Sequence, residues 1–240
     1  MSLFPQTSSY QYDKEFRGID KLSWLPWVGA RYAESPPGSR SLIVGESHYT
    51  PERDPAKVQE SIKSYQSTPE HTRSAITESA INRSWTNKTF DNIPRLVLGG
   101  DAKDRAEFWS TVAYHNLIQR VMRYGAPPER PTQADIDAGW KIFASVIRTL
   151  APDLVIVLGS CGAPRFGPSM EALNVPHKYQ PRVAKVGRCW AYAGEVTVGG
   201  KCTPLVFTRH PSQFFSWREW HGLVASRHPE AMGGLKNSLA

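Results

Sequence analysis

The chain has 240 residues, of which 40% are hydrophobic and 21% charged, and this balance excludes an intrinsically disordered chain. No apolar run approaches the roughly 20 residues that a membrane-spanning helix needs, so we expect no membrane partner. The formal net charge of +7 favours a polyanionic partner, although many soluble proteins without such a partner are also mildly basic.

Residues 1–40 mix polar residues with a Trp-Leu-Pro-Trp stretch and end in the breaker-rich segment Ser35–Ser39. We expect them to form an extended N-terminal arm that packs on the domain. The short apolar run Ser41–Gly45 follows and predicts a buried parallel strand.

Residues 54–85 have a polar, mostly helical pattern that is interrupted at Ser67–Pro69. The pattern of Phe108–Met122 fits a strand and a helix equally. Thr132, with Asp135 three residues later, predicts the start of a helix. The apolar residues that follow it recur at the spacing of an amphipathic helix packed on a sheet, and they are Ile136, Trp140, Phe143, Ile147 and Leu150.

The stretch Asp153–Gly159 gives the clearest strand signal in the chain, and Gly159–Gly162 turns it toward another helix. Trp190–Val198 and Pro204–Thr208 predict two more strands, and Trp217–His228 predicts a final helix. Apolar strands separated by helices predict a three-layer α/β domain with a mainly parallel central sheet flanked by helices.

Ligands in such folds bind outside the carboxyl ends of the strands, which directs attention to the segments after Gly45 and Thr208. GESHYTP occupies Gly45–Pro51, RHPSQFF occupies Arg209–Phe215, and AYHNLI lies between them at Ala113–Ile118. Each segment alone also has a structural interpretation, because a glycine can end a strand, an asparagine can cap a turn, and a histidine often forms structural hydrogen bonds.

Taken in chain order, these segments resemble the uracil-DNA glycosylase superfamily. Gly45–Tyr49 resembles its first motif, which is GQDPYH in one branch and GEAPG in another, and His210–Ser212 resembles the start of its second motif, HPSPLS. The segments between them follow the layout of the GEAPG branch. The resemblance covers about residues 41–217 and implies one glycosylase-like domain, with about residues 50–108 as an enlarged insertion.

The resemblance implies a DNA glycosylase that flips uracil or another damaged or modified pyrimidine out of DNA and hydrolyses its N-glycosidic bond. That chemistry needs a donor aimed at the oxygen of the departing base and an anion near the sugar or the water. His210 and Glu46 are the expected catalytic residues. Asn116 carries the donor and the acceptor that read a base edge. The other expected base-binding residues are Tyr49, His48 and Ser47.

The second motif also supplies the expected DNA-binding residues, which are Arg209, Ser212, Gln213 and Phe214. Phe214 stands where the superfamily places an apolar wedge that fills the gap left by a flipped base; a core phenylalanine is the alternative. The insertion holds a basic and aromatic mix suited to a nucleic-acid contact or a remodelled pocket, and a solvated helical insertion is equally compatible. That mix comprises His71, Arg73, Arg83, Trp85 and Lys88.

Two departures from the superfamily pattern matter. Ser47 stands where GQDPYH has a water-activating aspartate, so we expect Glu46 to take over, with Ser47 and His48 as the alternative. The GEAPG branch carries four cysteines for an iron–sulfur cluster, whereas this chain has three with no metal-ligand spacing. We therefore expect no cluster, metal or other cofactor.

Two other functions fit the same sequence: a catalytically inactive DNA-binding protein, and a hydrolase that acts on free nucleosides or nucleotides. DNA is the expected partner, and no obligate protein partner is inferred. The N-terminus lacks the charged and apolar regions of a signal peptide, so we expect a cytoplasmic protein.

Overall fold

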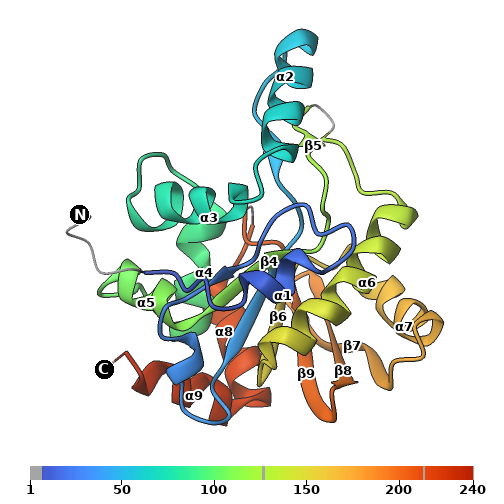
Figure 1. Ribbon diagram of the computed structural model, residues 1–240. Coiled ribbons are helices and arrows are strands. Elements are labelled where there is room, and N and C mark those ends of the chain that lie inside the picture. The colour runs from blue at the N-terminus through green and yellow to red at the C-terminus, as the bar shows by residue number, and fades with distance from the viewer. Residues whose placement is uncertain (1–6, 126–127, 213, 240) are drawn as a thin grey trace.

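The computed structural model describes residues 7–125, 128–212 and 214–239. These ranges form an α/β fold in which helices flank a seven-stranded mixed sheet (Figure 1). Its strands are β1 (Trp27–Val28), β2 (Ser41–Gly45), β4 (Ala113–Asn116), β6 (Leu154–Leu158), β7 (His177–Val186), β8 (Cys189–Val198) and β9 (Lys201–Thr208). The predicted α/β sheet with flanking helices is therefore confirmed at this level.

The strand order is β1-β4-β2-β6-β9-β8-β7. Strands β4, β2, β6 and β9 are parallel, whereas β1, β8 and β7 pair antiparallel with their neighbours. The sequence did not predict β7, because its side chains are mostly polar and it lies at the sheet edge. The central strands are buried on both faces, as expected for continuous apolar runs.

The two faces of the sheet carry separate hydrophobic clusters. In β2, Leu42 and Val44 pack into one cluster and Ile43 into the other, because successive side chains of a strand point to opposite faces. The first face is covered by α1 (Asp13–Arg17), α6 (Gln133–Leu150) and α7 (Ala163–Ala172). The second face is covered by α4 (Lys88–Leu98), α5 (Arg105–Thr111), α8 (Trp217–Arg227) and α9 (Pro229–Asn237).

Helix α6 begins where the sequence predicts. The Thr132 hydroxyl accepts the Asp135 backbone N–H at 3.2 Å, and the Asp135 carboxylate accepts the Thr132 N–H at 2.8 Å, which forms a capping box. The ambiguous stretch 108–122 contains both elements, since α5 ends at Thr111 and β4 begins at Ala113. The helix over 217–228 is not the final one, because Pro229 starts α9.

The described part of the N-terminal segment is built into the core. Phe16, Trp24, Trp27 and Tyr32 are all fully buried, and β1 adds an edge strand to the sheet; a 3₁₀ turn, η1, spans Tyr32–Glu34. The large aromatic side chains in this segment account for its attachment to the domain.

Between β2 and α4 the chain leaves the sheet at the carboxyl edge of the parallel strands, and α2 (Pro55–Gln66) projects beyond that edge (Figure 1). This stretch also contains β3 (Tyr49–Thr50), α3 (His71–Ala75) and the π-helical turn η2 (Ile76–Ile81). Strand β3 pairs in parallel with β5 (Met122–Arg123). Among the described residues, no helix is long and apolar enough to span a membrane.

Candidate active site

A cavity of about 610 Å³ opens at the carboxyl edge of the parallel strands. Its walls come from the segments that follow β2 and β9, from the end of β4, and from the insertion. It is lined by every residue expected to act in catalysis or base binding, namely Glu46, Ser47, His48, Tyr49, Asn116 and His210. Residues up to 164 positions apart in the chain therefore face one space.

The strand register brings these residues together. Gly45 pairs with Asn116 across β2 and β4, and Thr208 pairs with Leu158 at the same edge of the sheet. A Cβ atom on Gly45 would overlap the Tyr114 hydroxyl and Asn116 Oδ1. Glycine is therefore required at the end of β2 for the floor of the cavity to keep this arrangement.

The Glu46 carboxylate is held by a neighbouring donor. The Tyr49 hydroxyl donates to Glu46 Oε1 at 2.9 Å, and the Cys161 thiol lies close enough to feel the Glu46 charge. Burial, together with the Glu46 charge, raises the pKa of Tyr49 above its ordinary value and that of the Cys161 thiol to about 12. Both neighbours therefore stay protonated at neutral pH, and the Tyr49 hydroxyl fixes the carboxylate in place.

The His210 imidazole has a defined tautomer. Its Nδ1 accepts the Ser212 backbone N–H at 3.3 Å and lies 2.9 Å from the Ser212 hydroxyl. Burial lowers the pKa of His210, and the opposing influence of Glu46 is smaller. The ring is consequently neutral near pH 7, and because Nδ1 is an acceptor, Nε2 carries the proton.

Asn116 lies on the floor of the cavity, with 2% of its surface exposed. Its Oδ1 accepts the Tyr114 hydroxyl at 2.9 Å, and burial raises the pKa of Tyr114 so that this hydroxyl stays a donor. Within the described residues, Asn116 Nδ2 forms no hydrogen bond. The amide is thus oriented by the protein while its nitrogen stays available to a ligand.

Ser47 and His48 use their polar atoms within the protein. The Ser47 hydroxyl donates to the Arg120 carbonyl at 2.7 Å, and His48 Nε2 lies 2.9 Å from Thr72 Oγ1. Burial, and then the neighbouring His71, lower the pKa of His48 to about 3. The two residues line the cavity and also brace the loop after β2 against the insertion and against the segment that precedes β5.

The loop after β9 presents Phe214 to solvent. The side chain is 86% exposed, so Phe214 is not a core residue. The Arg209 guanidinium lies 5.7 Å from the centre of this ring, and Arg209 Nη1 lies 3.0 Å from Cys189 Sγ. The backbone N–H of Ser212 donates to His210 Nδ1, and the Ser212 hydroxyl lies beside the same nitrogen. Gln213, the fourth expected DNA-binding residue, lies outside the described residues.

A basic surface beside this loop was not predicted from the sequence. The turn between β7 and β8 lies at the same edge of the sheet, and three exposed basic residues lie at this end of the hairpin, Arg182 and Lys185 in β7 and Arg188 in the turn. Arg182 and Lys185 lie 5.8 and 5.9 Å from the ring centre of the exposed Trp190. None of the three forms an ion pair with a described residue. Basic residues recur in the sequence before Trp190, but only the position of β7 shows that they share one exposed surface.

The basic and aromatic residues of the insertion have different places. His71 and Trp85 line the cavity. Arg73 is buried and pairs with Asp13 and Glu70, so it joins the N-terminal segment to the insertion. Arg83 and Lys88 are exposed. The insertion therefore contributes both a cavity wall and a structural ion pair.

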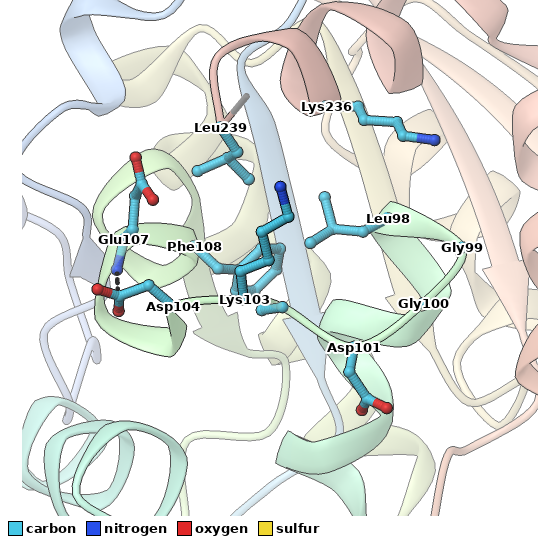
Figure 2. Close-up of a pocket in the computed structure, with 11 residues that line it drawn as sticks. Leu98, Gly99, Gly100, Asp101, Lys103, Asp104, Glu107, Phe108, Lys236 and Leu239 are labelled. Atoms are coloured by element: carbon cyan, nitrogen blue, oxygen red, sulfur yellow. Dashed lines mark hydrogen bonds between the residues drawn. The ribbon is translucent and has the colours of Figure 1, made fainter.

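A second hollow, of about 320 Å³, lies between α4, α5 and α9 (Figure 2). Leu98, Phe108 and Leu239 give it apolar walls, and its rim mixes both signs of charge. Its Asp104 is engaged as the N-cap of α5, accepting the Glu107 N–H at 3.1 Å. None of the three motif segments reaches this hollow, so we place the candidate active site in the cavity at the strand ends.

Within the described ranges, no three His, Cys, Asp or Glu side chains are grouped as a metal ion would require. The three cysteines are free, and Cys189 and Cys202 lie at opposite ends of the β8–β9 pair. Compared with known proteins, the chain matches no protein-family model and no curated protein sequence.

Proposed function

We propose that this chain is a monofunctional DNA glycosylase with a uracil-DNA glycosylase-like fold, which hydrolyses the N-glycosidic bond of a flipped pyrimidine. The observation that carries the proposal is the pairing of a fixed carboxylate with a neutral imidazole donor in one cavity. Glu46 and His210 supply these two groups, and Asn116 lies on the floor of the cavity at the end of β4, which pairs with β2.

The base-binding part of the proposal uses the floor of the cavity. Asn116 Nδ2 donates to the Watson–Crick edge of the base, while the Tyr114 hydroxyl keeps the amide in that orientation. His210 Nε2–H donates to the pyrimidine O2. A neutral donor suits this position because it stabilises negative charge as that charge develops on the base.

The reaction breaks the bond between the sugar C1′ and the base N1, and the electron pair leaves with the base. Negative charge spreads to O2, where the His210 Nε2–H stabilises it, and positive charge on the sugar faces the Glu46 carboxylate. A water oxygen then bonds to C1′ as Glu46 accepts the water proton. Among the described residues no lysine lines the cavity, so no Schiff base and no strand cleavage are expected.

The DNA-binding part of the proposal uses the surface around the cavity mouth. Phe214 serves as the wedge that enters the gap left by the flipped base. Arg209 and the basic turn of the β7–β8 hairpin contact phosphates on either side of it. Cations without acidic partners release counterions from DNA, which favours binding.

A set of oligonucleotides that each carry one uracil or one modified pyrimidine tests the proposal. After incubation, alkali converts each abasic site into a strand break. We expect breaks with the wild type and none above background with His210→Ala. DNA that is bound but left intact for every base would contradict the proposal in favour of an inactive binding protein. Cleavage of mononucleotides alone would favour a nucleoside hydrolase.

A further inference from the structure

The cavity extends beyond the residues that hold a base. Glu46, Asn116 and His210 belong to the strand ends, whereas a second group of lining residues belongs to the insertion. We call this insertion-side part the annex, and its walls are Tyr65, His71, Ser74, Glu78, Trp85 and Asn87. Pockets of 300–1,000 Å³ enclose drug-sized ligands, so about 610 Å³ is more than one pyrimidine ring fills.

The edges of a bound pyrimidine decide what can enter the annex. This step rests on the proposed function. His210 donates a hydrogen bond to O2, Asn116 donates one to the Watson–Crick edge, and N1 is bonded to the sugar. The edge that remains is C5–C6, and C5 is the position on it that carries substituents without disturbing base pairing. The Tyr49 hydroxyl is tied to Glu46, which keeps this side chain beside the carboxylate.

The annex combines polar groups with aromatic surface, and Ala75 and Phe90 add apolar surface on the same side of the cavity. Ser74 and Glu78 lie one helical turn apart, and neither side chain has a hydrogen-bond partner among the described residues. The Asn87 Oδ1 accepts the Thr89 N–H at 2.9 Å, which leaves the Asn87 Nδ2 as a donor. Trp85 is 45% exposed. Hydroxyl groups can pair with such donors and acceptors, while the indole packs against the less polar face of a ring.

The charges of the annex further restrict the chemical class of substituent that it can bind. Its one formally charged side chain among the described lining residues is Glu78, and no lysine or arginine lines it. An anionic substituent would meet this carboxylate without a cation to offset it. An apolar substituent would leave the polar walls unpaired. A neutral substituent with several hydroxyl groups satisfies both conditions.

We propose that the annex receives a neutral, hydroxylated substituent of about the size of a hexose, attached through C5 of the flipped pyrimidine. The substrate class is then a hypermodified pyrimidine in DNA, and uracil is a poorer substrate. The insertion serves as the specificity element, since the residues that form the annex lie within it. The competing explanation is that the annex holds a neighbouring nucleotide of the DNA strand.

Single-turnover base release from matched duplexes tests this proposal. The duplexes carry an unsubstituted pyrimidine, its 5-hydroxymethyl derivative, or a hexoside of that derivative, in both the uracil and the cytosine series. Ser74→Trp fills the annex from an exposed helical position. Thr77→Trp is the matched control, because Thr77 is exposed on the adjoining η2 turn and does not line the cavity. Thermal unfolding shows whether each variant is folded.

In the uracil or the cytosine series, we expect the hexoside-bearing base to be released at least about 10-fold faster than the unsubstituted base. One or two pocket contacts provide discrimination of this size. Ser74→Trp should lose at least about 10-fold on the hexoside and little on the unsubstituted base, and Thr77→Trp should leave both rates unchanged. Binding to duplexes whose target sugar carries a 2′-fluoro group, which blocks cleavage, should show the same preference.

The outcomes separate this proposal from the one on which it rests. Release of the unsubstituted base without release of the hexoside overturns the substrate class and leaves the glycosylase proposal standing. Equal losses on all bases with Ser74→Trp indicate that the annex holds a neighbouring nucleotide, which also overturns the substrate class. No release and no selective binding with any duplex overturns both proposals.

Discussion

Replacement of Glu46 by glutamine removes the negative charge of the site and changes little else. The two side chains have nearly the same shape, and the glutamine oxygen can still accept the Tyr49 hydroxyl that now lies 2.9 Å from Glu46 Oε1. The amide can neither accept the proton of the attacking water nor offset positive charge on the sugar. We therefore expect Glu46→Gln to fold normally, to bind DNA almost as tightly as the wild type, and to lose activity.

The size of the loss follows from electrostatics. A carboxylate about 4 Å from a unit positive charge, at an effective dielectric constant of about 20, stabilises it by about 4 kcal/mol. A tenfold change in rate corresponds to about 1.4 kcal/mol, so the chemical step should slow by about 1,000-fold. The same carboxylate is also the general base, and the effects of its two roles on the rate are not additive.

Single-turnover measurement of alkali-labile sites, with enzyme in excess, isolates the chemical step. Glu60→Gln is the matched control, because Glu60 is exposed on α2 and does not line the cavity. Ser47→Ala should be mild, since the Ser47 hydroxyl donates to the Arg120 carbonyl and its removal mainly costs about 1 kcal/mol of stability. A tolerated Glu46→Gln together with an inactive Ser47→Ala would refute the assignment of the water-activating role to Glu46.

Three further predictions concern the surface, the charge and the buried histidines. Phe214→Ala should slow base release from duplex DNA more than from single strands, where the target base is already unstacked; equal losses would mean that Phe214 is not a wedge. Lys185→Gln and Arg188→Gln should each lower the salt dependence of DNA affinity, measured as the slope of log affinity against log salt, by about one; an unchanged slope would exclude the hairpin turn from the interface. The free energy of unfolding should fall as the pH drops below about 6.5, because the unfolded chain takes up a proton that buried His48, with its pKa of about 3, does not bind. His48→Gln should make that fall shallower in urea titrations, and an unchanged dependence on pH would contradict the burial of a neutral imidazole.

The sequence predicted the parts of the fold that depend on local pattern. The apolar runs at Ser41–Gly45, Asp153–Gly159 and Pro204–Thr208 mark three of the four parallel strands, because strands buried on both faces are continuously apolar. The helix after Thr132 was predicted because its cap and its apolar spacing agree. Parallel strands end at one edge of the sheet, which is why segments far apart in the chain could be expected to meet there.

The remaining features depend on contacts that the sequence does not encode locally. Arg73 belongs to a basic and aromatic segment, yet Asp13, 60 residues away, pairs with it and makes it structural. The hydroxyl of Ser47 is directed to the carbonyl of Arg120, 73 residues later in the chain. The annex is formed by short helical pieces of the insertion, whose packing follows no periodic pattern. Strand β7 is polar and lies at an edge, so it lacks the hydrophobic signal of a strand.

In the proposed reaction, water activated at Glu46 replaces the base at C1′ of a nucleotide in DNA. Base release can be followed in water enriched in a heavy oxygen isotope, with mass spectrometry of both products. We expect an intact free base without the label and an abasic sugar that carries one labelled oxygen, with no strand break before alkali. DNA that stays whole, or a strand that breaks without alkali, would contradict it.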